Sequence, residues 1–456
     1  MAEQQKSKHT MDLTEGPILK KVIIFSVPLV LSSIFQLLFN AVDAMVVGKF
    51  AGDNSLAAVS SNGPIINLIT NIFMGLSIGG NVLVARYFAS KEEDKLTKVV
   101  HTSITISTIF GVLLIVLGWF MTQKLLEWTN CQPGVIELAK IYLRIYFFGM
   151  PATMIYNFGA AILRGVGDTK RPMIYLVIAG VINVALNLLL VIVFRLDVVG
   201  VAVATVVSQT ISAILVVKCL LQEVGAIQLQ LKKLGVHFPT LWNMMKIGIP
   251  SGIQSSMFSL SNVVVQSNIN SFGNIVMSGN GAAQNLESFL AVSIRALSQA
   301  TISFVSQNVG AKKYARIDRI VITIILCGVI IDAISGNLVY LLGEQLVGLY
   351  SNSPVVIKAG VVRLGIACSF HFIYAMMDIM AGALRGMGRT IVPMIVSILG
   401  VCVFRVAWVS MLGATGVDYG IEAIYWTYPM SWALTLLAHT VYYFISKALL
   451  KKKAQT

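Results

Sequence analysis

The sequence predicts an all-α polytopic membrane protein of about twelve transmembrane helices, arranged as two pseudo-symmetric six-helix bundles around a central cavity. Three observations support this fold class: the composition, a series of long apolar runs and an internal repeat. Of the 456 residues, 56% are hydrophobic and only 12% are charged, which is about half the charged fraction of a typical soluble domain. Apolar surface on this scale needs lipid around it.

Twelve apolar runs follow one another along the chain, each close to or above the roughly 20 residues that cross a bilayer core. In the first half they cover residues 22–47, 56–85, 99–121, 135–161, 173–194 and 199–221. In the second half they cover residues 241–269, 277–305, 320–347, 355–383, 391–412 and 421–445.

The distribution of basic residues predicts the orientation of these helices. Most of the 34 Lys and Arg residues fall in loops on one side, while Arg363 is assigned to the other side. Because Lys and Arg accumulate in cytoplasmic loops, both termini are expected in the cytoplasm, with the protein in the cell inner membrane. The net charge of +14 is then a topology signal that also attracts lipid headgroups, and no nucleic-acid-binding module is found.

An internal repeat divides the chain into two halves. Residues 163–174 read LRGVGDTKRPMI and residues 384–395 read LRGMGRTIVPMI, an offset of 221 at which most positions agree. Six spans per copy give both halves the same orientation, related by an axis along the membrane normal. The sequence predicts five parts: a cytoplasmic tail (1–16), a first lobe (17–221), a cytoplasmic linker (222–239), a second lobe (240–446) and a basic cytoplasmic tail (447–456).

The first helix carries a polar stripe inside an apolar run. Ser32, Gln36, Asn40 and Asp43 are spaced by four, four and three residues and therefore share one helix face. A carboxyl group within a span is costly and marks a functional site by default. We expect Asp43, with Asn40 beside it, to bind and release a coupling cation or proton, although a carboxyl group there could also only hold a neighbouring helix.

The fifth and sixth helices offer oxygen atoms that could lie beside Asp43. Asn183 and Asn187 are four residues apart, and Thr205, Gln209 and Ser212 repeat the spacing of one face. Such oxygens suit a hard ion such as sodium, and a proton is served equally well. Simple hydrogen bonding between helices is the alternative explanation.

The second half has no acid in its first helix, because Val265 stands in the register of Asp43. Its charges lie elsewhere. Glu287 and Arg295 are eight residues apart in the eighth helix, on roughly one face, which suggests an internal ion pair or a site that attracts a cationic substrate.

A third acid lies in the tenth helix, where Asp378 has methionines around it, among them Met377. One acid with soft thioether side chains suits an apolar cation. With Gln36, these residues of the eighth and tenth helices form the predicted substrate cavity, and packing is the alternative role for Met377 and Asp378.

The residues that other classes of function require are not found in this sequence. The five cysteines are too scattered for a disulfide framework, so free thiols are expected. A membrane enzyme would need clustered His, Asp or Glu, and no Walker sequence is found for ATP. A passive channel would not need two movable lobes. No cofactor is expected beyond a coupling ion, H⁺ or Na⁺.

The doubled LRGxGxT motifs, the VDAMVVG sequence at 42–48 and INVALN at 182–187 resemble the multidrug and toxic compound extrusion family over nearly the whole chain. The amino-lobe cation site of that family matches Asp43, Asn183, Asn187 and Thr205. Many members have an aspartate where this chain has Asn187, which favours Asp43 as the principal titrating group. A glutamate that another branch carries in the seventh helix is absent here.

This resemblance implies secondary antiport, in which lipophilic, often cationic organic compounds leave the cell in exchange for protons or sodium by alternating access of two lobes. The implied partners are small organic molecules and membrane lipids, with the monomer as the functional unit. The main rival is a flippase for a lipid-linked saccharide, which would favour several basic residues in the cavity, whereas only Arg295 and Arg405 lie within the predicted spans.

Overall fold

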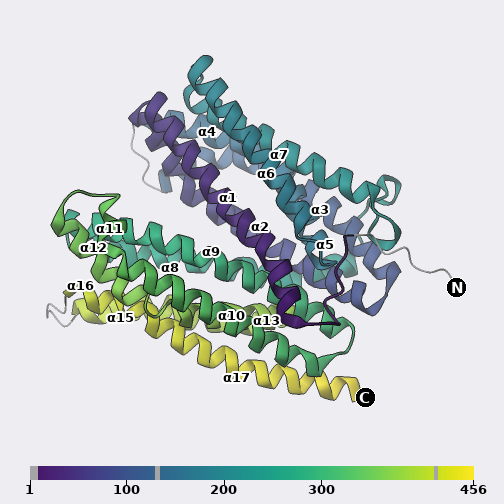
Figure 1. Ribbon diagram of the computed structural model, residues 1–456. Coiled ribbons are helices and arrows are strands. Elements are labelled where there is room, and N and C mark those ends of the chain that lie inside the picture. Colours follow the sequence, from purple (N-terminus) through teal and green to yellow (C-terminus); the bar gives the residue numbers. More distant parts are fainter. Residues whose placement is uncertain (1–8, 129–133, 415–419, 456) are drawn as a thin grey trace. The chain divides into compact units, whose positions relative to one another are not determined.

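A computed structural model describes residues 9–128, 134–414 and 420–455 of the chain (Figure 1). The described residues form helices and no strand, which confirms the predicted all-α class. By internal contacts the chain divides into two compact units, and each is treated by itself. Residues 1–12 and 27–249 form unit 1, and residues 13–26 and 250–456 form unit 2. The predicted linker at 222–239 thus lies inside unit 1, and the predicted lobe boundaries remain sequence predictions.

Unit 1 contains the first six predicted spans. Its helices are α1 from residue 27 on, α2, α3, the pair α4 and α5, α6 with the π-helix η1, and α7. Their bounds are Ile18–Phe50, Asp53–Ser90, Glu93–Trp128, Ile136–Phe148, Met150–Gly165, Lys170–Asn187, Leu188–Val193 and Asp197–Gln222. Two short 3₁₀ turns, η2 (Gly225–Ile227) and η3 (Leu231–Lys233), follow α7.

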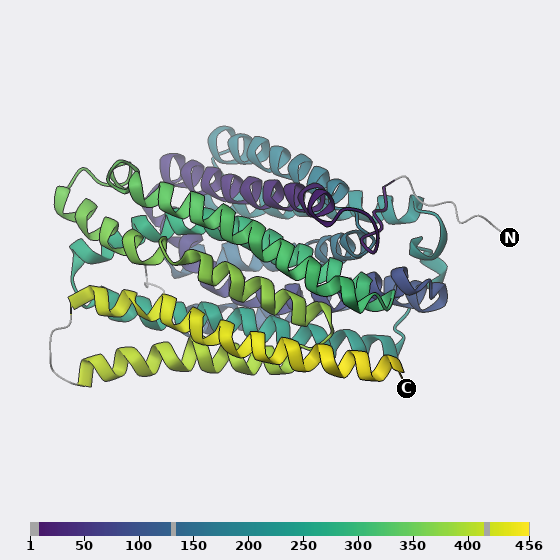
Figure 2. The same cartoon turned by 60° about the horizontal axis from the view of Figure 1, so that its bottom comes forward.

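Unit 2 contains the other six. It begins within α8 (Phe238–Asn270), and α13 packs against α9, α10 and α17 (Figure 2). The elements after α8 are α9 Asn274–Gly310, α10 Tyr314–Leu341, α11 Gly343–Gly348, α12 Pro354–Ala367, α13 His371–Gly386, α14 Ile391–Ser397, η4 Ile398–Val403, α15 Phe404–Ala414, α16 Gly420–Tyr425 and α17 Thr427–Gln455.

Within the described residues, eight helices have the length and composition of a membrane span, or ten when two bent pairs are each counted as one. The bent pairs are α4 with α5, at 47°, and α12 with α13, at 48°. Helices α8 and α10, of 33 and 28 residues, supply the remaining two of the twelve predicted runs. Long apolar side chains such as Phe120, Val193 and Leu437 are well exposed, as lipid-facing residues are.

The backbone confirms the internal repeat. At the offset of 221, Gly52 pairs with Gly273, Lys91 with Lys312 and Gly167 with Gly388, and all six have positive φ angles, between 57° and 94°. The repeated motif also has a packing role, because a Cβ atom on Gly165 would lie 2.7 Å from the Val84 side chain, and one on Gly386 would lie 2.8 Å from Val305. These glycines let α5 and α13 approach α2 and α9 closely.

The segment predicted as a free cytoplasmic tail is held in part. Residues 9–16 are described, and Leu13 is fully buried. Within unit 2, its backbone N–H donates to Oε1 of Gln307 at 2.9 Å, and Asn308 donates to its carbonyl oxygen at 3.1 Å. An apolar side chain and two backbone hydrogen bonds explain why this short polar stretch is ordered.

Candidate functional site

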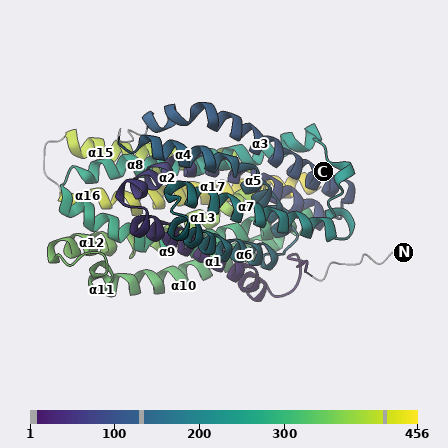
Figure 3. The same ribbon diagram turned by 90° about the horizontal axis from the view of Figure 1, so that it is seen from above.

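Unit 1 contains a pocket around Asp43, with a volume of about 70 Å³. It lies between α1, α6 and α7, whose arrangement can be followed in Figures 1 and 3. Its lining consists of Gln36, Phe39, Asn40, Asp43, Leu176, Ala179, Gly180, Asn183, Thr205, Ser208, Gln209 and Ser212. This space is large enough to admit water, which needs roughly 10–15 Å³ of such volume.

The predicted polar stripe and the predicted oxygen atoms therefore meet in one place. Asn40, Asn183 and Thr205 line the pocket with Asp43, and Asn187 reaches the same carboxylate by a hydrogen bond. Helix periodicity brought each set to one face, and the packing of α1 against α6 and α7 brings the faces together. The roles of these residues in ion coupling remain predictions.

Close packing of α1 against α6 depends on a glycine that the sequence reasoning missed. A Cβ atom on Gly180 would lie 1.8 Å from the Phe39 ring. The hydrogen atom at this position therefore lets the ring lie directly on α6, one turn of α1 before Asp43. A glycine in the middle of an apolar helix was the available signal, because Gly there costs stability unless packing requires it.

The hydrogen bonds of the pocket centre on Asn187. Its side-chain N–H group donates to Oδ1 of Asp43 and, at 3.2 Å, to Oδ1 of Asn183. Its own Oδ1 is buried and makes no hydrogen bond to the described residues. The Thr205 hydroxyl donates to the carbonyl oxygen of Val201 at 3.0 Å, which leaves its lone pairs available.

The helix geometry changes directly beyond Asn187, where the π-helix η1 begins at Leu188. Such wide turns are uncommon and are frequent at functional sites. The π-helix consists only of apolar residues, and it begins directly after Asn187. The two asparagines therefore lie in the regular part of the helix, just before the π-turn.

Among the described residues, Asp43 is the one acidic side chain that lines the pocket, and no Lys, Arg or His side chain lines it. None of the ion pairs found among the described residues includes Asp43. One carboxylate with amide and hydroxyl oxygens around it is the donor set that a proton or a hard cation prefers. The residues at this site thus fit the coupling ion that the sequence suggested.

The residues of the predicted substrate cavity are divided between the two units. Gln36 lies in the pocket of unit 1, whereas Met377, in unit 2, is 2% exposed and packed in the core of that unit. Asp378 lies 3.9 Å from Arg385, measured from Oδ1 to Nη1. Their part in substrate binding remains a prediction.

The expected pair between Glu287 and Arg295 is wrong. Glu287 instead accepts two hydrogen bonds from Arg363 of α12, at 2.7 and 2.8 Å, while Arg295 is exposed. Eight residues of a helix turn through about 800°, so the two side chains of α9 diverge by about 80°. Arg363, assigned above to an outer loop, is 1% exposed within α12.

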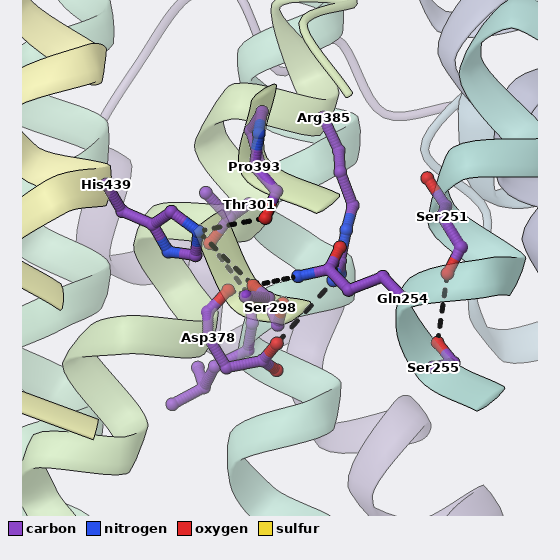
Figure 4. A network of polar contacts seen from close by, with 11 residues as sticks. Ser251, Gln254, Ser255, Ser298, Thr301, Asp378, Arg385, Pro393 and His439 are labelled. Carbon is purple, nitrogen blue, oxygen red and sulfur yellow. Dashed lines mark hydrogen bonds and ion pairs between the residues drawn. The ribbon is translucent and has the colours of Figure 1, made fainter. Parts of the chain in front are cut away.

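Unit 2 contains a second polar network, which Figure 4 shows from close by. Gln254 of α8 donates to the Ser397 hydroxyl at 2.6 Å and accepts from Arg385 at 3.0 Å. Ser397 lies 3.4 Å from Nε2 of His439, which is 1% exposed. This network joins α8 to α13, α14 and α17, and no periodic pattern of polar residues predicted it.

The histidine, cysteine and acidic side chains of the described residues bear on metal binding and on disulfides. No group of three or more His, Cys, Asp or Glu side chains suitable for a metal is found among them. Cys219, Cys327, Cys368 and Cys402 are free thiols, as expected. Cys131 lies outside the described residues.

Comparisons with known proteins agree with the motifs. The MatE family model matches residues 28–189 and 250–409. The probable multidrug resistance protein YoeA of Bacillus subtilis is 27% identical over 452 residues, 97% of each chain. The multidrug export protein MepA of Staphylococcus saprophyticus is 23% identical over 410 residues, 89% of this chain and 91% of MepA.

Solved structures share the fold. A crystal structure of MATE in the bent conformation matches 99% of this chain and 100% of its own, with a TM-score of 0.91 and 20% identity. A MOP superfamily transporter from Pyrococcus furiosus matches 98% of this chain and 100% of its own, with the same TM-score and identity. With the family model covering most of both halves, the chain belongs to the MatE family, the multidrug and toxic compound extrusion transporters that its motifs resemble.

Proposed function

We propose that this protein is a multidrug exporter that moves lipophilic, mostly cationic organic compounds out of the cell in exchange for protons or sodium ions. The curated relatives support the export of drugs, since they are named multidrug resistance and multidrug export proteins. The exchange for an ion rests on the pocket in unit 1. Among the described residues, it has one carboxylate and no basic partner for it.

The coupling step is the binding of a cation to Asp43. In the empty state the carboxylate is charged and held by Asn187. A proton or sodium ion neutralises it and changes its hydrogen bonds, and this difference must favour one conformation over another for coupling to occur. Substrate binding and ion binding then compete through the conformational equilibrium, and each reduces the affinity for the other.

The choice between proton and sodium depends on the number of acids. Among the residues that the structure describes, Asp43 is the only carboxylate in the pocket lining, and the other side-chain oxygen atoms there are neutral. A sodium ion would be held by Asp43, Asn183, Asn187 and Thr205, with one negative charge to balance it. A proton needs only Asp43, and the pocket therefore favours protons.

The energy available is sufficient for export. One positive charge moving inward across a membrane potential of roughly 120 mV releases about 3 kcal/mol. This supports a concentration ratio of about 100-fold for an uncharged compound. Exchange of one proton for one monovalent cation moves no net charge, so export of such a cation draws on the pH difference or on a second proton. We propose that a monomer in the cell inner membrane does this work, with both termini cytoplasmic and lipids around the apolar helix faces.

The proposal is tested with the purified protein in liposomes. Uptake of a fluorescent lipophilic cation is followed while a proton gradient or a sodium gradient is imposed separately. Uptake driven by either gradient supports antiport, and uptake with a proton gradient alone identifies the ion. Equal uptake with and without both gradients contradicts antiport. Movement of labelled lipid without movement of the dye would favour the flippase instead.

A further inference from the structure

Unit 2 contains a buried arginine whose charge has no carboxylate beside it. Arg405 lies in the first turn of α15, directly after the π-helix η4, and is 2% exposed. Its Nε donates to the Ser431 hydroxyl at 2.9 Å and its Nη1 donates to Oδ1 of Asn262 at 3.0 Å. Both acceptors are neutral. A guanidinium group stays protonated in proteins, so a full positive charge is held inside the unit.

A second buried arginine in the same unit provides the comparison. Arg363 donates to both carboxylate oxygens of Glu287 and, at 2.6 Å, to Oδ1 of Asn280. Glu287 is thereby engaged on both oxygens. No ion pair of Arg405 is found among the described residues, whereas Arg363 is fully neutralised. Of these two buried arginines, only Arg405 therefore has no carboxylate partner among the described residues.

An aromatic residue lies beside both arginines. The guanidinium carbon of Arg405 lies 4.4 Å from the centroid of the Tyr428 ring, and that of Arg363 lies 5.0 Å from it. The hydroxyl group of Tyr425, in contact with Arg363, is buried and makes no hydrogen bond to the described residues. The cluster thus has an excess of positive charge and an unused polar group, both of which suit an added acceptor.

The internal repeat gives this arginine a counterpart. Asn262 and Val265 of α8 stand where α1 has Asn40 and Asp43. In unit 1 the helix after the motif brings Asn187 to an acid, and in unit 2 the corresponding helix brings Arg405 to Asn262. The same pair of helices therefore carries a negative charge in one unit and a positive charge in the other. Asn262 is partly exposed, so the guanidinium lies one hydrogen bond from accessible surface.

We propose that Arg405, Asn262 and Tyr428 form an oxyanion-binding subsite in unit 2. It takes a carboxylate or phosphate group, which would accept hydrogen bonds from the guanidinium. The guanidinium supplies paired N–H donors and the Asn262 amide supplies a further one. The subsite is independent of the ion pocket at Asp43 and of the direction of transport.

The experiment uses the full chain in nanodiscs of phosphatidylcholine, with benzoate as the probe and benzamide as its neutral isostere. Calorimetric titration is expected to give saturable binding of benzoate and none of benzamide. Arg405→Gln weakens benzoate binding at least tenfold. Arg195→Gln, which removes an exposed positive charge of unit 1, leaves it unchanged. Equal binding of benzoate and benzamide, or binding unaffected by Arg405→Gln, overturns the proposal.

Two further arms protect the test and identify the source of the oxyanion. If Arg405→Gln fails to fold, Asn262→Leu replaces it, and the comparison of the two probes on the unchanged protein still decides. Nanodiscs containing phosphatidylglycerol then separate two sources. Loss of benzoate binding in that lipid, with lipid retained in native mass spectra, assigns the subsite to a headgroup. Unchanged benzoate binding assigns it to a soluble compound.

Discussion

The side-chain amide of Asn187 donates to the carboxylate of Asp43, and the same N–H group also contacts Asn183. One amide on α6 therefore connects the acid of α1 with the other asparagine of its own helix. Occupation of the carboxylate by an ion is expected to weaken this contact, because a neutral carboxyl group accepts a hydrogen bond less strongly than a carboxylate does. We propose that a local change in charge at Asp43 is transmitted in this way to the packing of α1 on α6.

Asn187→Asp is expected to shift the protein toward sodium. A second carboxylate in contact with the first raises the negative charge available to a hard cation. Sodium-driven dye uptake in liposomes is expected to rise at least tenfold relative to the unchanged protein. Gln209→Glu, which adds an acid elsewhere on the pocket lining, is the control for charge alone. Identical sodium dependence in all three proteins would show that position 187 does not set ion preference.

Gly180→Ala is expected to abolish ion coupling while leaving the protein folded. A Cβ atom 1.8 Å from the Phe39 ring must displace that ring and, with it, the part of α1 that holds Asp43. Adding Phe39→Ala makes room again and is expected to restore most of the coupled uptake. Gly63→Ala, where no atom lies within 4 Å, is the matched control. A Gly180→Ala protein with normal uptake would refute this role for the close packing.

Glu287→Gln is expected to destabilise unit 2 by about 3 kcal/mol, because removing one partner of a buried ion pair leaves the other charge unpaired. The measurement is thermal unfolding of the purified protein in one detergent. Glu344→Gln removes an exposed acid of α11 and is expected to change stability little. Arg295→Gln is expected to behave like this control, since Arg295 does not pair with Glu287. Equal losses for both glutamates would contradict the pairing.

Glu223→Gln tests how the segment after α7 is held. Arg171 donates to both Asp168 and Glu223, which are 3% and 4% exposed, and so joins the repeated motif to the end of α7. Loss of one acid is expected to expose residues 223–239 to limited proteolysis at a higher rate. Asp94→Asn, an exposed acid on α3, serves as the comparison. Unchanged cleavage in the Glu223→Gln protein would mean that its contact with Arg171 does not hold this segment.

The sequence was sufficient to predict the spans and the pocket. Length and apolarity predict a membrane helix well, because an unpaired backbone group in lipid is so costly that few structures are possible. The spacing of Gln36, Asn40 and Asp43 follows directly from helix geometry. Their meeting with Asn183 and Asn187 required only that the polar faces of three apolar helices avoid lipid.

Ion pairs between helices that are distant in the sequence could not be predicted from the sequence. Glu287 had a plausible partner on its own helix, and only the packing of α12 on α9 brings Arg363 to it instead. The bends within the fourth and tenth spans were also unforeseen. In the first, Pro151 lies two residues after Gly149 and lacks a backbone donor, but in the second no proline lies between Ala367 and His371. The two bends lie at corresponding places in the internal repeat. The residues at the bends do not explain both of them, because only the first bend has a proline nearby.

The central claim is that Asp43 carries the exchanged ion, and the Asp43→Asn protein in liposomes tests it most directly. The substitution keeps the size of the side chain and removes its charge. Dye uptake is measured against an imposed proton gradient together with proton movement in the same vesicles. We expect dye binding to persist in the Asp43→Asn protein, while gradient-driven uptake and dye-dependent proton movement are both lost. Full exchange by the Asp43→Asn protein would contradict it.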